Sequence, residues 1–172
     1  MTTTERAMHV PAPEFDDGRR AQAIGALNGC LASMIDLALC AKQAHWNLLG
    51  PNFAGLHELL DVVAAEARDW ADLLAERAVT IGGTAHGTVQ DVTSGSGLPA
   101  FPTDERNWQV LAREVHLRTL ATAARTRELA RDLDDELVTQ DLCVEIVRGL
   151  ERRAWMLAAH LEQEGSSGTA AR

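Results

Sequence analysis

Apolar residues recur every three or four positions along most of the chain, which is the spacing of one face of an α-helix. In residues 19–49 this seam consists of Ile24, Leu27, Leu31, Met34, Ala38 and Ala41. In residues 53–81 it consists of Phe53, Leu56, Leu60, Val63, Ala67, Trp70 and Leu74. In residues 139–163 it consists of Cys143, Ile146, Leu150, Ala154, Leu157 and Leu161. A further helix is predicted at 104–131, where an acidic start suits a helix N-terminus.

Glycine and proline mark the ends of these segments. A Gly-Pro pair at 50–51 ends the first helix, and a Gly-Gly pair at 82–83 ends the second. Asn52 and Thr139 are predicted N-caps of the helices that follow them. Residues 82–103 are rich in Gly, Ser, Thr and Pro and are long for a connection within a compact domain. We expect them to cross the length of a bundle, with a short helical turn inside.

Four long helices with one long crossover, between the second and third, predict an all-α four-helix bundle over residues 19–163. Residues 1–18 and 164–172 are expected to be flexible tails. The composition agrees, because the good helix formers Ala, Leu, Arg and Glu dominate, aromatic residues make up only 4%, and Tyr is absent. A chain of 172 residues is long enough to bury a real core.

Charge and cysteine content narrow the function classes. The net charge is -9 and the sequence pI is about 5.1, whereas nucleic-acid-binding domains usually carry a basic patch. The three cysteines form no CxxC pair and are expected to be buried free thiols. No signal peptide is visible, and the apolar stretch 27–41 is too short to span a bilayer. The sequence therefore predicts a soluble, cytoplasmic protein.

The second predicted helix carries a row of metal-ligand residue types. His57 and Asp61 lie one turn apart, Asp72 and Glu76 likewise, and the eleven residues between the pairs return to nearly the same direction. His45 occupies a seam position on the preceding helix. One interpretation is a solvated polar face with a core histidine. However, no Lys stands at the i+4 positions, as in many solvated salt-bridged faces. Nitrogen and carboxylate donors without Cys suit a borderline or hard metal such as iron, and carboxylates favour its oxidised form.

The usual di-iron site inside a helical bundle needs two Glu-x-x-His pairs, one from each of two helices. The residues three positions before the six histidines are Arg6, Lys42, Ala54, Gly83, Arg113 and Leu157. The chain therefore contains no such pair, and a conventional centre of this kind is excluded. A metal site in this protein must be built in another way.

Three segments resemble the signature of the Dps family, the DNA-binding proteins from starved cells. They are 42–53 (KQAHWNLLGPNF), 56–61 (LHELLD) and 75–77 (AER). The intervals between successive residues of the series His45, His57, Asp61, Asp72 and Glu76 are 12, 4, 11 and 4 residues, as in that family. The resemblance extends from about residue 20 to 163.

This resemblance implies a ferritin-like hollow dodecamer built from two-fold dimers. It implies a ferroxidase and iron-storage protein that oxidises Fe(II) with hydrogen peroxide or oxygen, keeps the ferric mineral inside and protects against oxidative damage. Iron is then the only cofactor. The implied ferroxidase ligands are His45, His57, Asp61, Asp72 and Glu76.

Other implied roles have simpler alternatives. Trp46 matches the Trp beside the family's metal centre and is either a core aromatic residue or an electron donor. Asp134, Asp135 and Asp141 match the region that lines acidic three-fold pores, or they only cap the last helix and complement its dipole. No partner can be identified in the sequence for His86, His116 or His160, and these three and the tail residue His9 are expected to be non-functional.

Geometry predicts that the metal site is shared between two chains. His57 and Glu76 are nineteen residues apart, or about 28 Å along one helix, whereas metal–ligand bonds are only about 2.0–2.2 Å long. Two antiparallel copies of the helix would bring the histidine end of one copy to the Asp72/Glu76 end of the other. A two-fold dimer then contains two equivalent sites.

A DNA-condensing structural protein is the alternative function. In the family, DNA affinity usually comes from tails rich in Lys and Arg, which neutralise phosphates. Here residues 1–20 and residues 161–172 each carry a net charge of one negative unit. DNA binding is therefore expected to be weak or absent.

Overall fold

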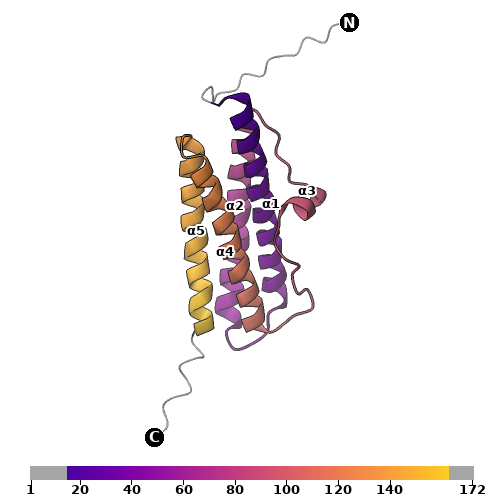
Figure 1. Ribbon diagram of the computed structural model, residues 1–172. Helices are drawn as coiled ribbons and strands as arrows, with labels where there is room; N and C mark the ends of the chain where they lie inside the picture. The colour runs from indigo at the N-terminus through magenta and orange to yellow at the C-terminus, as the bar shows by residue number, and fades with distance from the viewer. Residues whose placement is uncertain (1–14, 163–172) are drawn as a thin grey trace.

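The computed structural model describes residues 15–162. Four long helices run side by side, and one short helix, α3, lies outside them against α1 (Figure 1). The elements are α1 (Asp17–Asn47), α2 (Phe53–Thr80), α3 (Val89–Gly95), α4 (Trp108–Asp132) and α5 (Leu137–Glu162). α1 packs mainly on α2, and α4 packs mainly on α5. The predicted all-α bundle is confirmed, and so is the long crossover with a short helix within it.

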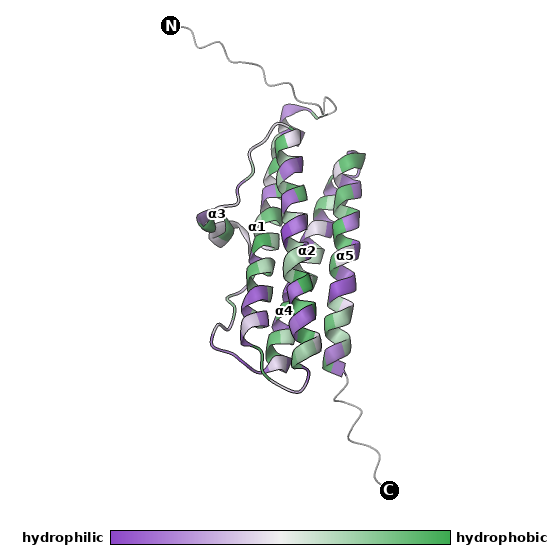
Figure 2. Ribbon diagram, turned by 180° about the vertical axis from the view of Figure 1, so that it is seen from behind, coloured by the Kyte–Doolittle hydropathy of each residue, from purple (hydrophilic) through white to green (hydrophobic). Residues whose placement is uncertain are grey.

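The predicted seams form the core of the bundle. Leu27, Met34, Leu74 and Ile146, one or two from each seam, are fully buried. Hydrophobic and hydrophilic residues are mixed along the visible side of the long helices (Figure 2). Phe53 is an exception, because 44% of it is exposed. The helical period therefore predicted the core except at the start of α2.

Among the described residues, α1 is the one helix that is long and apolar enough to cross a membrane. α1 has 31 residues and is longer than the apolar stretch 27–41, so the length of the helix does not exclude a membrane span. However, 56% of its apolar window is buried inside the bundle, as expected for a core helix of a globular protein.

The helix starts differ from the predicted ones because side chains cap them elsewhere. α1 begins at Asp17, where the Asp16 carboxylate accepts a hydrogen bond from the Arg19 amide at 2.8 Å. α4 begins at Trp108 and not at 104, because the Asn107 side chain accepts from the amides two and three residues later, at 2.9 and 3.2 Å. The predicted tail 1–18 is therefore helical in its last two residues; residues 1–14 and 163–172 lie outside the described residues.

The predicted cap of α5 is wrong. Thr139 lies inside α5, and its amide donates to the Glu136 carboxylate at 2.7 Å. The Thr139 hydroxyl accepts from Arg77 of α2 at 2.8 Å, and Arg77 also forms a 2.9 Å ion pair with Glu136. A buried ion pair thus anchors the acidic turn before α5 to α2. Asn52 stands at the N-cap position of α2, but its side chain makes no capping hydrogen bond.

The turn between α1 and α2 is held against the start of α4. The Leu49 amide donates to the Arg106 carbonyl at 2.8 Å. Gly50 has a φ of 149°, and the Trp108 ring occupies the space where a Cβ would lie, so only glycine fits there. These contacts fix the adjoining ends of α1 and α2, where both helices present histidines.

Candidate metal centre

His45 of α1 and His57 of α2 form a reciprocal pair. Their rings stack with centroids 3.7 Å apart and 23° between the planes. The His45 Nδ1 lies 2.8 Å from the His57 carbonyl oxygen, and the His57 Nδ1 lies 3.0 Å from the His45 carbonyl oxygen. A carbonyl can only accept, so each Nδ1 donates. In the neutral ring the lone pair is then on Nε2, which is the arrangement found in metal-binding histidines.

Asp61 lies one turn beyond His57 on α2. Its side chain is 56% exposed, and Lys42 Nζ of α1 lies 2.5 Å from its Oδ1. The hydrogen bond from Lys42 holds the pKa of Asp61 below its ordinary value, and the charge of Lys42 and the two nearby histidines adds to this effect. The carboxylate is therefore ionised and available to a cation.

Lys42 is a site residue that sequence reasoning missed. The absence of Lys at the i+4 positions was correct within α2, but Lys42 reaches Asp61 from the neighbouring helix. It stands three residues before His45, so it lies on the same face of α1. Once both helices were predicted to contribute to one site, this spacing could have identified it.

Two exposed aromatic residues flank the histidines. The Phe53 ring stacks on His57 with centroids 4.9 Å apart. Trp46 is 68% exposed, and the Lys42 ammonium lies 5.8 Å from its ring centroid. Trp46 is therefore not a core aromatic residue of this chain, which corrects one of its two interpretations.

Asp72 and Glu76 lie further along α2, and both are exposed. Asp72 borders a surface cavity of about 320 Å³ that also contacts Ile35 and Arg68. Within residues 15–162 of one chain, no three His, Cys, Asp or Glu side chains come together to hold a metal ion. The five predicted ligands thus form two separate groups in the subunit, one with the histidines and one without.

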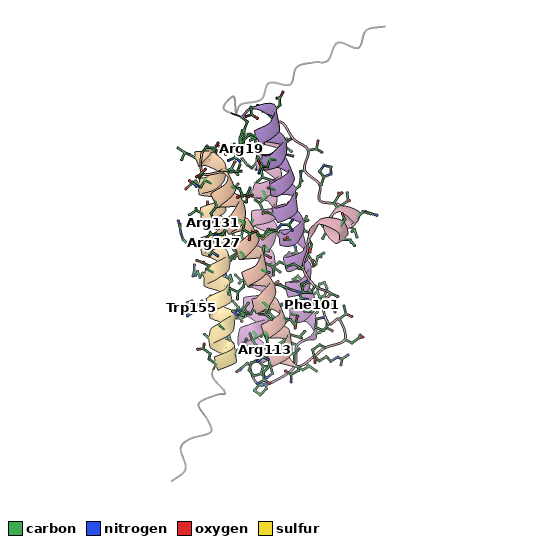
Figure 3. All side chains as sticks on the ribbon, in the orientation of Figure 1. Arg19, Phe101, Arg113, Arg127, Arg131 and Trp155 are labelled. Atoms are coloured by element: carbon green, nitrogen blue, oxygen red, sulfur yellow. The ribbon has the colours of Figure 1, made fainter. Side chains whose placement is uncertain are left out.

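Of the three carboxylates predicted to line a pore at the start of α5, one forms an ion pair within the subunit. Asp135 forms a 2.6 Å ion pair with Arg19, and this hydrogen bond holds the pKa of Asp135 below its ordinary value. Arg19 lies at the end of the bundle where α1 begins (Figure 3). Asp134 and Asp141 are exposed. The pore assignment of these three carboxylates stays a prediction.

Two histidines outside the site have partners that the sequence did not identify. The His116 Nδ1 lies 2.9 Å from the Ala154 carbonyl oxygen and joins α4 to α5. The His86 Nδ1 lies 3.9 Å from Asp91 in the crossover. These contacts come from elements distant in the sequence or from a loop, so helical spacing could not reveal them. His9 lies outside the described residues.

Similarity to known proteins covers almost the whole chain. A family model described as a ferritin-like domain matches residues 24–165. The chain is 37% identical over 163 residues to the DNA protection during starvation protein of Agrobacterium fabrum, covering 91% of this chain and 98% of that protein.

Solved structures agree with this match. Dps from Microbacterium arborescens in its high iron form is 35% identical with a TM-score of 0.80, covering 85% of this chain and 96% of that one. Mycobacterium smegmatis Dps in a tetragonal form is 31% identical with a TM-score of 0.84, covering 92% and 98%. The identity, the coverage and the shared fold together show that the chain belongs to the Dps family of ferritin-like proteins.

Proposed function

We propose that this protein is a ferroxidase that also stores iron. It oxidises Fe(II), with hydrogen peroxide or oxygen as the oxidant, at sites shared between two subunits. It retains the ferric product inside a hollow homododecamer in the cytoplasm and so protects the cell against oxidative damage. Iron enters as substrate and leaves the site as cargo.

The observation that carries this proposal is the arrangement of the histidine pair. Both Nδ1 atoms are bound to carbonyl oxygens, so both Nε2 atoms remain for a metal, and the ionised Asp61 lies one turn away. Reciprocal hydrogen bonds fix the tautomer and the orientation of both rings before any ion arrives. A core histidine pair would not need an exposed carboxylate beside it.

The remaining ligands come from a second subunit. Asp72 and Glu76 lie about 22 and 28 Å from His57 along α2 at about 1.5 Å per residue, which is far beyond a coordination bond. An antiparallel second copy of α2 brings its Asp72 and Glu76 to the histidine end of the first. Each two-fold dimer then holds two sites of two histidines and three carboxylates.

The donor types suit the oxidation. Imidazole binds ferrous iron well, and carboxylates stabilise the harder ferric ion, so the site favours the product over the reactant. Each ferrous ion gives up one electron. Reduction of one hydrogen peroxide molecule to two water molecules therefore consumes two ferrous ions and two protons. The description of the Microbacterium arborescens structure as a high iron form supports iron as the metal.

Asp134 and Asp141 support a second part of the proposal. Both carboxylates are exposed; Asp134 lies in the turn before α5, and Asp141 lies near the start of α5. Three subunits that meet at this end of α5 would line an acidic route for cations into the shell. Asp135 contributes less to this route because Arg19 neutralises it.

DNA binding is proposed to be weak or absent. The similar protein of Agrobacterium fabrum is named for DNA protection, and protection can follow from removing ferrous iron and peroxide without contact to DNA. The whole chain has a net charge of -9. Polyanion binding depends on positive charge, which neither terminal segment supplies in excess.

A double variant tests the function. His57→Ala with Asp61→Ala removes two donors of the histidine group, and we expect ferrous oxidation, followed by ultraviolet absorbance after anaerobic loading, to slow by at least about tenfold. His160→Ala with Glu145→Ala removes one histidine and one carboxylate from α5 and should leave the rate unchanged. A parental rate in the first variant, with the helical circular dichroism signal of both intact, would contradict the assigned site.

A further inference from the structure

Arg125 of α4 is a half-buried cation without a counter-ion in the subunit. Three other arginines with largely buried side chains each form an ion pair with a glutamate; these pairs are Arg77–Glu136, Arg118–Glu114 and Arg153–Glu66. Within residues 15–162, Arg125 forms no such pair. Because a charge held away from water is costly unless it is paired, Arg125 is suited to bind an anion that the chain does not supply.

One nitrogen of the Arg125 guanidinium fixes its orientation. Nη1 donates to the Ser33 hydroxyl at 2.7 Å and to the carbonyl oxygens of Gly95 and Ser96, both at 2.8 Å. Nη2 and Nε make no hydrogen bond to the described residues, and both reach solvent. These two groups donate along one edge of the guanidinium, which is the fork that binds two oxygens of a carboxylate or a phosphate.

Two glycines of α1 leave this edge of the guanidinium uncovered. A Cβ at Gly29 would overlap Nη2 of Arg125 and lie 3.3 Å from Nε, so a larger residue there would displace the guanidinium or cover its free edge. A Cβ at Gly25, one turn earlier, would point into open space. Both glycines and Arg125 line a cavity of about 310 Å³ between α1 and α3. The free edge of the guanidinium therefore borders a cavity with room for a ligand.

The crossover supplies another wall of this cavity. Asn28 Oδ1 accepts a hydrogen bond from the His86 amide at 2.8 Å, and Asn28 Nδ2 donates to the Thr84 carbonyl oxygen at 2.9 Å. These bonds hold the crossover against α1. The His86 side chain lines the cavity and is 57% exposed. Its ring can donate an N–H to a ligand that Arg125 holds.

Asp91 of α3 also lines the cavity, but its carboxylate is engaged with other groups. Thr88 donates to Asp91 Oδ2 through its hydroxyl at 2.6 Å and through its amide at 3.0 Å, and these bonds hold the pKa of Asp91 below its ordinary value. The Oδ1 atom lies 3.9 Å from His86 Nδ1. The charge of Asp91 is therefore directed to Thr88 and His86, and that of Arg125 stays uncompensated.

We propose that this cavity binds a small tetrahedral oxyanion, free inorganic phosphate. Two of its oxygens accept from Nε and Nη2 of Arg125, and a third accepts from the His86 ring. A planar carboxylate has only two oxygens and would leave the third donor without a partner. The guanidinium is already fixed through Nη1, so binding costs little side-chain freedom. The inference does not rest on iron chemistry, because none of these residues belongs to the proposed metal site.

Equilibrium dialysis of the assembled, iron-free protein against radiolabelled inorganic phosphate tests the site. We expect one phosphate per subunit with a dissociation constant on the order of 1 mM, as suits a few hydrogen bonds in a cavity open to solvent. Gly25→Leu fills the cavity from α1, and the dissociation constant should rise at least about tenfold. Gly18→Leu, at an exposed glycine of the same helix, should bind phosphate as the parent does.

A second variant removes a donor without filling the cavity. His86→Ala changes an exposed side chain, so the fold should persist, and we expect the dissociation constant to rise about three- to tenfold. Arg125→Gln would remove the fork, but it would also remove the hydrogen bonds that anchor the end of α3. Gly25→Leu and His86→Ala therefore decide the test.

No phosphate bound by the parent at about 10 mM, or parental binding by Gly25→Leu, would overturn the site. Unchanged binding by His86→Ala would contradict the third hydrogen bond. Sulfate should displace the bound phosphate, whereas acetate at the same concentration should not. Equal displacement by both would overturn the choice of a tetrahedral oxyanion.

Discussion

Replacing Lys42 with methionine should tighten divalent-metal binding at the histidine group. Lys42 Nζ lies 2.5 Å from Asp61 Oδ1, and 16% of its side chain is exposed. A metal ion bound to Asp61 must therefore share this carboxylate with an ammonium group or displace it. Methionine keeps the length and the apolar stem of the side chain and removes only the competing charge.

The size of the effect follows from Coulomb repulsion. A unit charge and a divalent ion about 5 Å apart in a watery environment repel by an amount that corresponds to roughly tenfold in affinity, and salt reduces this further. Asp61 is largely exposed, so the dielectric of water is the appropriate one. We therefore expect the dissociation constant to fall by about three- to tenfold.

Calorimetric titration with zinc measures this change without oxidation. Arg113→Met is the matched control, because it changes the net charge of the protein equally and lies on α4, whereas Lys42 and Asp61 lie on α1 and α2. Its affinity should equal that of the parent. Unchanged or weaker zinc binding by Lys42→Met would refute the reasoning, since it would mean that Asp61 is not a ligand or that Lys42 does not compete for it.

Three other predictions concern the thiols, the core and DNA. Burial raises the pKa of Cys30 to about 11 and those of Cys40 and Cys143 to about 12, so thiolates are scarce at pH 8. A thiol reagent should therefore react only after unfolding, and rapid labelling of the native protein would contradict this. Gly149→Ala should lower the free energy of unfolding by about 1–3 kcal/mol in urea titrations, because the new Cβ would overlap the Trp70 ring. An unchanged free energy of unfolding would show that the ring can move. Plasmid DNA should not shift in a gel at about 0.15 M salt, where surface charges are screened beyond about 8 Å, whereas a clear shift would reveal a basic surface on the assembled shell.

The helical period predicted the fold because most seam residues face one continuous core. It failed at helix starts, because a single capping side chain determines the residue at which a helix begins. Thr139 has the residue type of an N-cap, but the carboxylate three residues earlier takes its amide, and its hydroxyl binds Arg77. Such competition depends on the neighbouring helix, which a local pattern does not contain.

The sequence predicted which residues form the histidine group of the candidate site. It did not predict the charge that surrounds Asp61. Spacing alone placed His57 and Asp61 on one face of α2, and the structure brings His45 onto the first of them. The stacking of the two rings and the ion pair with Lys42 depend on how α1 and α2 are paired. Trp46 shows the same limit, because its exposure depends on which side of α1 the other helices leave open.

The central claim is that two chains build each metal site, and mixed reassembly tests it most directly. Chains carrying His57→Ala and chains carrying Glu76→Ala are unfolded, mixed in equal amounts and refolded, and ferrous oxidation is measured per subunit. In a mixed dimer one site carries both lesions and the other carries none. Random pairing then leaves about a quarter of all sites intact, so activity should recover to about a quarter of that of the parent, above either variant alone. If mass spectrometry shows mixed dimers and no activity returns, the site lies within one subunit and the account is wrong.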